Sequence, residues 1–274
     1  KQVSDQRDDF IRLGVLGQWE NPYLTLNKSY EAEQIRAFAK IVENDHLVHG
    51  HRPAHWCLDC KSALAEAEVV YQDKESITID VRFQVSDVDE FCSRVGLNQP
   101  KTNRSVCVPI WTTTPWTLPA NQAVVLGNDL DYILVAADIG QGLDYFVVAQ
   151  GLEESIRGRW QSSNWETIGS INPKDLEGLL LDHPFYDRGV PILLGDHVTL
   201  ETGTGAVHTA PAHGHDDFII GKEHDLPLDN PVNADGVYNE STELFAGEHV
   251  YKVEPSIIEE LKKNNNLIHY EHLQ

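Results

Sequence analysis

Short apolar runs follow one another along the chain from about residue 52 onward, separated by Gly, Pro, Asn and Asp. The runs are rich in Val, Ile, Thr and Tyr, a composition typical of β-strands. They predict strands at 67–71, 77–83, 106–112, 123–126, 132–137, 145–149, 190–194, 197–200 and 205–209. Many short strands at uneven spacing indicate an α+β, mainly β fold, built as a closed or partly closed β-barrel with peripheral helices.

Helical spacing dominates the first fifty residues instead. Apolar side chains recur at i, i+3, i+4 and i+7 from Ile35 to Val42, and Ser29 is a candidate N-cap for a helix over 30–44. Other helices are predicted over 6–17, 87–96, 152–159 and 255–264. We therefore expect three parts, which are an N-terminal helical segment over 1–50, a stem over 51–72 and a β-rich domain over 73–274.

The composition is that of an ordinary globular protein, with 41% hydrophobic and 23% charged residues among 274. No apolar run reaches the ~18 residues of a membrane-spanning helix, and the start of the chain lacks the apolar core of a signal peptide. Four cysteines are too few for a disulfide scaffold and favour a reducing, cytoplasmic setting. Because the chain starts at Lys1 and contains no Met, we expect it to be part of a longer protein.

The net charge narrows the possible partners. Lys and Arg number 21 against 43 Asp and Glu, which gives a formal charge of −22. A broad basic surface for phosphates is therefore excluded, and with it an autonomous, high-affinity nucleic-acid-binding domain. No feature marks an oligomer, so a monomer is expected.

A threonine-rich motif, WTTTPWTLPAN, occupies residues 111–121. Thr112, Thr113 and Thr114 end a β-type run, and Pro115 then prevents further ladder pairing. Hydroxyl groups both donate and accept hydrogen bonds, so a bend here would suit a ribose, a water or an ester carbonyl. The alternative is a threonine-rich strand edge with a tryptophan packed beneath it.

A second motif, GTGAVHTAPAHGHDDF, occupies residues 203–218. Gly203 and Gly205 would let the backbone approach a ligand closely. Asp217 is a candidate anchor for an ammonium group, and His208 could orient a water, act as a base or line a pocket. Side chains of the kinds that ligate metals are also gathered here, namely His208, His213, His215 and Asp217. Two alternatives are therefore open, a metallohydrolase and a polar loop with solvated histidines.

Cys57 and Cys60 form a CxxC motif, which in a reducing compartment indicates half of a zinc site or a redox pair. A structural zinc ion needs four ligands. Cys92 and Cys107 are isolated within a predicted helix and a predicted strand, so we interpret them as core residues. The motif therefore predicts a half site whose other ligands are absent from this chain.

The two motifs at 111–121 and 203–218 together resemble the editing domain of isoleucyl-tRNA synthetases. The stretch WCLDCKSALAEAEVVY resembles the stem that joins this domain to the class I catalytic core, and QRDDFIRLGVLGQWENPYLT resembles the core just before the insertion. Valyl and leucyl enzymes typically carry TTRP where this chain has TTTP, and valyl enzymes typically carry Lys at the position of His208. The HIGH and KMSKS signatures of amino-acid activation are absent from the sequence, so we expect no aminoacylation by this chain alone.

The resemblance implies a role for each matching position. Asp217 matches the aspartate that holds the α-ammonium group, and His208 matches the histidine that excludes the isoleucine side chain. Thr112, Thr113 and Thr114 match the threonines around the scissile ester. The substrate-binding positions implied by the motifs are Trp116, Asn121, Gly203, Gly205, Ala206, Thr209 and Asp217.

The implied reaction is hydrolysis of the ester in valyl-tRNA for isoleucine, with isoleucine excluded. One methylene is worth only ~1–3 kcal/mol in a hydrophobic pocket, a range for which isoleucyl-tRNA synthetase is itself the standard example, so a second site adds selectivity. No serine with an evident base is present, which favours direct attack by water. A non-catalytic tRNA-docking insertion is the other alternative.

The resemblance also implies partners and cofactors. The expected partners are the aminoacylated 3′ end of tRNA and the remainder of the synthetase, with no membrane. Editing itself is expected to need no cofactor. A structural zinc ion through Cys57 and Cys60, together with ATP and Mg²⁺ in the catalytic core, would belong to the whole enzyme.

Overall fold

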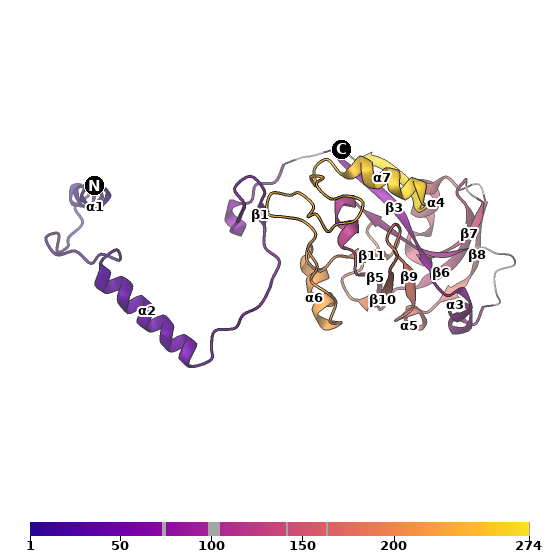
Figure 1. Ribbon diagram of the computed structural model, residues 1–274, viewed down its shortest axis with the longest axis horizontal. Coiled ribbons are helices and arrows are strands. Elements are labelled where there is room, and N and C mark those ends of the chain that lie inside the picture. The colour runs from indigo at the N-terminus through magenta and orange to yellow at the C-terminus, as the bar shows by residue number, and fades with distance from the viewer. Residues whose placement is uncertain (73–74, 98–104, 141, 163, 274) are drawn as a thin grey trace. The chain divides into compact units, whose positions relative to one another are not determined.

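The computed structural model describes residues 1–72, 75–97, 105–140, 142–162 and 164–273. The chain divides into two compact units, Lys1–His51 and Arg52–Gln274. The first unit contains α1 (Gln2–Arg12) and α2 (Lys28–Glu43) (Figure 1). Neither helix has a buried residue. The apolar face predicted for α2 is therefore uncovered within its own unit, where Ile35 is 70% exposed.

The first helix starts and ends earlier than the predicted span of 6–17. Gly14 adopts a positive φ of 81°, and the N–H of Val15 donates to the carbonyl of Phe10, which closes the helix. Glycine tolerates this left-handed conformation, so Gly14 stops the helix that the apolar spacing alone would have continued.

The second unit is built on a sheet of ten described strands in the order β11-β5-β10-β9-β3-β4-β7-β6-β8, with β12 beside β3. The pairing is antiparallel except for β4 with β7 and β5 with β10. The strands are β3 (Ser76–Val85), β4 (Val106–Thr112), β5 (Ala123–Gly127), β6 (Tyr132–Asp138), β7 (Leu143–Ala149), β8 (Asn164–Ile171), β9 (Leu180–Asp182), β10 (Gly189–Gly195), β11 (Ala206–Thr209) and β12 (Leu267–Leu273).

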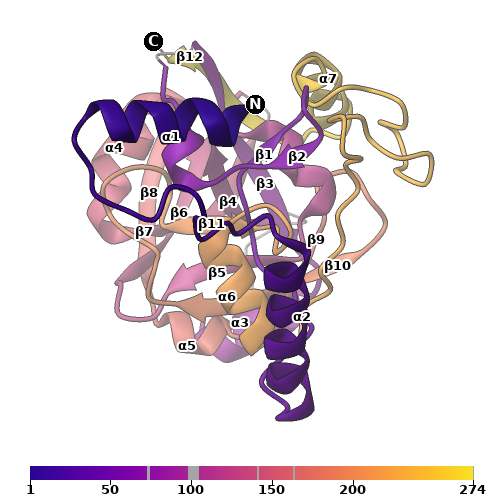
Figure 2. The ribbon, with the colours of Figure 1, turned by 90° about the vertical axis from the view of Figure 1, so that its left-hand side faces the viewer.

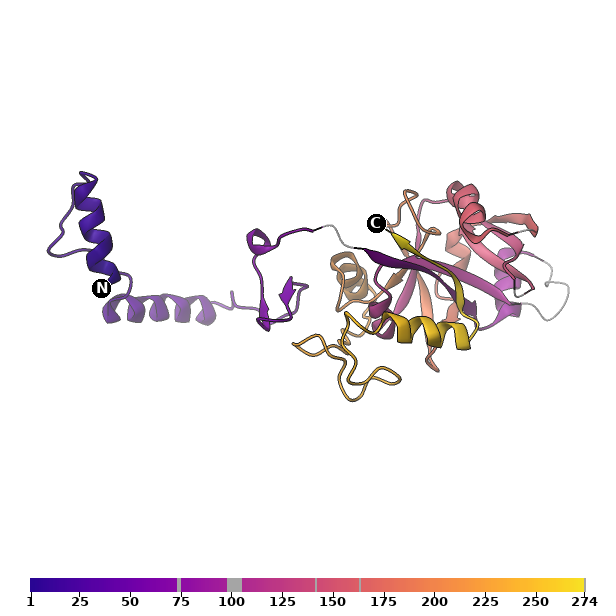
Figure 3. The same cartoon turned by 90° about the horizontal axis from the view of Figure 1, so that it is seen from above.

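Helices cover the ends and edges of this sheet. α3 and α5 pack against each other at one end (Figure 2), and α7 lies beside β12, which runs along β3 (Figure 3). The bounds are α3 (Val88–Val95), η2 (Pro115–Ala120), η3 (Gln150–Leu152), α4 (Glu153–Trp160), α5 (Pro173–Leu176), α6 (His215–Glu223) and α7 (Glu254–Lys263). Among the described residues, no helix is long and apolar enough to cross a bilayer.

The central strand β3 is buried on both faces, because successive residues from Thr78 to Phe83 are all buried. One end of the sheet curls back onto β4, where the Thr204 hydroxyl donates to the Pro109 carbonyl at 2.6 Å. No ladder joins β11 to β8 among the described strands. The α+β, mainly β class is therefore confirmed, whereas a closed barrel is not observed.

The predicted strands that correspond to β3, β4, β5, β6, β7, β10 and β11 are confirmed. Those over 67–71 and 197–200 are wrong. The first stretch opens in a 3-10 helix, η1 (Glu66–Glu68), where the Ala65 N–H donates to the Glu68 carboxylate at 2.8 Å. In the second, Val198 is buried just after a turn and belongs to no described strand.

Three strands of this sheet, β8, β9 and β12, and two α-helices, α5 and α6, were not predicted. β8 is an edge strand in which buried and exposed positions alternate imperfectly around Gly169, and β9 has only three residues. The helix α6 begins inside the histidine-rich motif, whose composition alone predicts a polar loop.

The stem folds as a small hairpin, β1 (Trp56–Cys57) paired with β2 (Ser62–Ala63). Two contacts tie it to the loop that follows α6. The indole N–H of Trp56 donates to the Ala234 carbonyl at 2.8 Å, and Lys61 forms an ion pair with Asp235 at 3.2 Å.

Candidate functional site

His208 lies on β11 and is buried, with hydrogen-bond partners on both ring nitrogens. Its Nε2 is 2.7 Å from the hydroxyl of Thr117, and its Nδ1 is 3.2 Å from Nδ2 of Asn121. Both partners come from the threonine-rich motif, 91 and 87 residues away in sequence. Thr117 lies within η2, and Asn121 directly follows it. The fold therefore brings the two motifs into one polar network.

The directions of these hydrogen bonds are determined by their outer partners. Asn121 Nδ2 also donates to the Ala123 carbonyl at 2.8 Å, so its amide nitrogen faces the ring of His208 and Nδ1 must accept. The Thr117 hydroxyl donates to the Thr114 carbonyl at 2.9 Å, so it must accept from Nε2. His208 is therefore the neutral tautomer that is protonated on Nε2.

Burial lowers the pKa of His208 to about 4, and the nearby His213 contributes in the same direction. The imidazole is thus uncharged at neutral pH, and both of its nitrogens are already engaged. A general base needs a free lone pair within reach of its proton. This geometry suits a rigid wall of a pocket better than a base.

Thr117→Val should destabilise this network, because it removes the acceptor for the buried Nε2–H of His208. A buried donor left unpaired costs about 1–3 kcal/mol, which urea unfolding would measure. Thr113→Val is the matched control, since Thr113 is exposed, and it should change the free energy of unfolding by less than about 0.5 kcal/mol. Equal effects of the two variants would contradict the network.

The threonine run forms a bend at the end of β4. The hydroxyls of Thr112 and Thr114 lie 3.2 Å apart, and the N–H of Thr114 donates to the Thr112 hydroxyl at 3.1 Å. Thr113 is exposed, and its carbonyl accepts from the Ser76 hydroxyl at 3.1 Å. Two of the three hydroxyls therefore meet, next to the carbonyl that ends the His208 network.

Asp217 lies in the first turn of α6, and its Oδ2 accepts from the N–H of Ala210 at 3.0 Å. Ala210 follows β11 directly, so this contact holds the carboxylate at the end of the strand that carries His208. Burial raises the pKa of Asp217, which the Ala210 N–H partly offsets. An incoming cation would relieve this desolvation, so the group suits an ammonium ligand.

Gly214 makes room for the Asp217 side chain. A Cβ at position 214 would lie 2.8 Å from Cγ of Asp217, closer than real side chains approach. The glycine that caps α6 is thus required by the position of the carboxylate.

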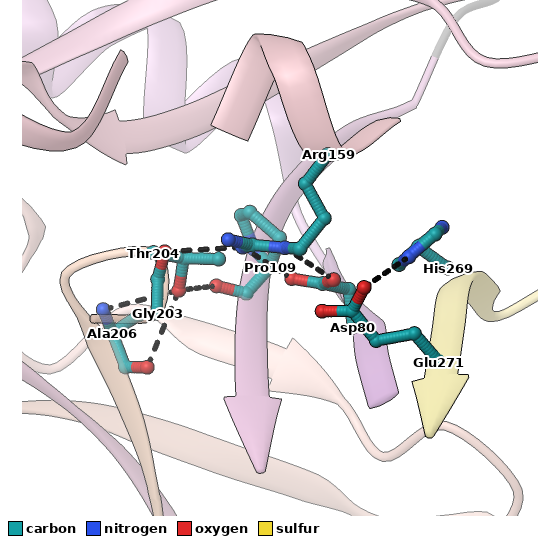
Figure 4. A network of polar contacts seen from close by, with 8 residues as sticks. All are labelled: Asp80, Pro109, Arg159, Gly203, Thr204, Ala206, His269 and Glu271. Atoms are coloured by element: carbon teal, nitrogen blue, oxygen red, sulfur yellow. Dashed lines mark hydrogen bonds and ion pairs between the residues drawn. The ribbon is translucent and has the colours of Figure 1, made fainter. Parts of the chain in front are cut away.

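The loop at 203–205 is held in place by a side chain from α4 and by its packing against the end of β7. Arg159 reaches from α4 to both carboxylate oxygens of buried Asp80, at 2.9 and 2.8 Å, and donates to the Gly203 carbonyl at 3.1 Å (Figure 4). Gly205 has a φ of 83°, and a Cβ there would lie 2.3 Å from that of Ala149. The two glycines therefore have a structural reason of their own.

The remaining predicted positions lie around this centre. Trp116 packs edge-on against His213, with ring centroids 5.2 Å apart, and Ala206 and Thr209 are buried on β11. Sequence reasoning missed Thr117, which lies inside a quoted motif, and the pair of Asp80 and Arg159, whose 79-residue separation leaves no local signal.

Among the described residues, no group of three or more His, Cys, Asp or Glu side chains lies close enough together to hold a metal ion, so His208, His213, His215 and Asp217 do not form the predicted alternative metal site. Cys57 and Cys60 do meet, because the Cys60 N–H donates to Sγ of Cys57 at 3.3 Å and lowers its pKa. Two thiols on one tight turn fit half of a tetrahedral zinc site.

Lowering the pH from 7.5 to 5 should reduce the free energy of unfolding. Burial lowers the pKa of His183 to about 3 and that of His213 to about 4, as it does for His208. Below about 6.5 the unfolded chain binds protons that the folded chain does not, at about 2 kcal/mol per histidine by pH 5. Asp80 and Asp217, whose pKa values burial raises, act in the opposite direction. Urea unfolding at both pH values measures the balance, and a flat profile would contradict it.

The comparisons with known proteins identify the family of the chain. A family profile described as tRNA synthetases class I (I, L, M and V) matches residues 1–269. The isoleucine--tRNA ligases of Nitrosococcus oceani and Alkalilimnicola ehrlichii are 50% and 49% identical over 100% and 98% of this chain. The chain spans 29% and 28% of the length of these two relatives.

Solved structures support the same fold. The editing domain of the cytosolic leucyl-tRNA synthetase of P. knowlesi aligns with a TM-score of 0.58 at 12% identity, covering 73% of this chain and 98% of that domain. The corresponding P. falciparum domain gives 0.57 at 10% identity, covering 73% and 100%. The chain therefore belongs to the class I tRNA synthetase family, and within it is related to the isoleucine--tRNA ligases.

Proposed function

We propose that the second unit is an editing site that hydrolyses the ester of valyl-tRNA for isoleucine and excludes isoleucine. One observation carries this proposal. A neutral, doubly hydrogen-bonded His208 lies on β11, and the desolvated carboxylate of Asp217, from α6, is held at the end of the same strand by the Ala210 N–H. An apolar side chain needs an uncharged wall, whereas an ammonium group needs a carboxylate.

The roles of the residues follow from their chemistry. Asp217 would bind the α-ammonium group of the aminoacyl moiety and so orient the ester. The neutral edge of His208 would limit the length of the side chain. The hydroxyls of Thr112 and Thr114 would hydrogen-bond the terminal ribose or the attacking water, with Thr113 at the exposed rim. Direct attack of water gives free valine and intact tRNA, with the proton passing to the ribose oxygen that leaves.

The other predicted positions would complete the substrate-binding surface. Trp116 would contact the terminal adenosine, and Asn121 would act through His208, whose Nδ1 it holds. Gly203, Gly205 and Ala206 would offer backbone groups to the ester, on a loop held by Arg159 and Thr204. The sheet that curls onto β4 would serve as the partly closed barrel around this site.

Cofactors and partners follow from the same proposal. Editing would need no cofactor, whereas Cys57 and Cys60 would supply two of the four ligands of a structural zinc ion in the whole synthetase. ATP and Mg²⁺ would serve its catalytic core. The partners would be the 3′ end of tRNA and the remainder of that cytoplasmic enzyme, which would contribute the basic surface for the tRNA body.

Deacylation in trans tests the proposal. The 274-residue chain, at micromolar concentration and moderate salt, should release valine from valyl-tRNA for isoleucine faster than buffer alone. Moderate salt is chosen because it screens the repulsion between the charge of −22 and the tRNA body. A folded chain that binds the tRNA without releasing valine would instead favour a non-catalytic docking insertion.

A further inference from the structure

A cavity of about 750 Å³ lies beside Trp116 and His213, between the stem hairpin and the loop after α6. Its volume falls within the range of about 300–1,000 Å³ that is typical of small-ligand sites. Arg52, His55 and Trp56 contribute from the stem, and residues 230–234 contribute from the loop. The cavity therefore adjoins the proposed editing site but is formed largely by residues that the proposal above does not use.

The charge of this cavity differs from that of the chain as a whole. The chain carries 43 acidic residues among 274, yet none of the described residues that line the cavity is Asp or Glu. The nearby carboxylate of Asp235 is paired with Lys61 at 3.2 Å. Asp229 lies close enough to His213 to act on it electrostatically but does not line the cavity. Arg52 is thus the one charged side chain among the described lining residues, which suits an anion.

The lining also offers aromatic rings and free hydrogen-bonding atoms. Trp56 is 46% exposed, and its indole N–H, which donates to the Ala234 carbonyl, orients the ring. Trp116 is oriented by its edge-on contact with His213. Nε2 of His213 is buried and has no hydrogen-bond partner among the described residues. Oriented aromatic faces, a guanidinium and an unpaired ring nitrogen are the groups that bind an unstacked base and its phosphate.

We propose that this cavity binds a nucleotide of the single-stranded 3′ segment of tRNA, immediately 5′ of the aminoacylated adenosine. The inference rests on the proposed function, since the editing site fixes where the terminal adenosine lies. Trp56 would stack on the base, Arg52 would contact the phosphate, and His213 would hydrogen-bond the base edge or the 2′-hydroxyl. A small acid-free cavity would then let a strongly acidic domain hold the end of a polyanion.

Binding is tested with the trinucleotide CCA and with ribose 5-phosphate, which carries a phosphate but no base. In NMR titrations of the full chain, CCA should shift the indole N–H resonance of Trp56, whereas ribose 5-phosphate, which cannot stack on the ring, should not. Trp56→Leu should weaken CCA binding about tenfold, the size of one stacking contact. Trp165→Leu is the matched control, because the indole of Trp165 also makes one hydrogen bond, at 2.9 Å to Glu153, outside the cavity.

A second variant tests the phosphate contact independently. Arg52→Gln should lower the salt dependence of CCA binding by about 0.7 in the log–log slope, the value for one phosphate on a single strand. Arg157→Gln removes the same charge from an exposed position on α4 and should leave the slope unchanged. An unshifted Trp56 resonance at saturating CCA, or equal effects in variant and control, would overturn the proposal.

Kinetics separate this proposal from the one on which it rests. In valyl-tRNA deacylation, Trp56→Leu should raise KM about tenfold and leave kcat unchanged. If valyl-tRNA is hydrolysed and the KM is the same with and without Trp56→Leu, the nucleotide site alone is refuted. A Trp56 resonance that responds to CCA in a chain without deacylase activity would support the nucleotide site and refute the editing function.

Discussion

Asp217→Ala is expected to reduce the rate of valyl-tRNA deacylation by about 10²–10³-fold, equivalent to about 3–4 kcal/mol. The carboxylate is held by the Ala210 N–H at the end of β11 and is desolvated, so its pairing with an ammonium group is strong. Without it, the substrate loses the contact that orients its ester. Steady-state release of valine measures the effect.

Two variants separate charge from fold in this experiment. Asp216→Ala removes the same charge from the adjacent, exposed residue and should leave the rate within about twofold. Gly214→Ala keeps the carboxylate but places a Cβ 2.8 Å from its Cγ, and should reduce the rate by displacing it. Full activity of Asp217→Ala would remove this residue from the mechanism.

His208→Ala is expected to make isoleucyl-tRNA a substrate, with its hydrolysis raised at least tenfold. The imidazole is clamped by Thr117 and Asn121 and cannot swing aside, so an extra methylene meets a rigid wall. A pocket enlarged by one side chain no longer discriminates through one methylene, a difference of ~1–3 kcal/mol for which isoleucyl-tRNA synthetase is the standard example. Hydrolysis of valyl-tRNA should change less than that of isoleucyl-tRNA.

The control for this variant is His215→Ala, which truncates an exposed histidine of the same motif. It should leave isoleucyl-tRNA resistant. If His208→Ala is folded and isoleucyl-tRNA still resists hydrolysis, His208 is not the steric barrier.

The sequence predicted most of the central sheet because strands such as β3, β5 and β6 are apolar runs bounded by turn residues. It failed where tertiary context decides the structure. The apolar run at 197–200 has no pairing partner, and α6 starts within a stretch of His, Gly and Asp that local propensity assigns to a loop. The curl of the sheet onto β4 depends on contacts such as Thr204 with Pro109, which are 95 residues apart.

The candidate site was predictable as a set of residues but not as a network. The two motifs name Thr112, Thr114, Asn121, His208 and Asp217, yet only the fold shows that Thr117 and Asn121 fix the tautomer of His208. For Gly203 and Gly205 the sequence alone could not separate a binding role from a structural one, because backbone conformation and packing already require glycine at these positions.

The central claim is that one buried site accepts valine and rejects isoleucine, and the ratio of two deacylation rates tests it most directly. Valyl- and isoleucyl-tRNA for isoleucine, at equal concentrations with the 274-residue chain, should be hydrolysed at rates that differ at least tenfold in favour of valine, and Asp217→Ala should abolish the faster rate. Equal rates for the two substrates, or a ratio unchanged by Asp217→Ala, would contradict this account.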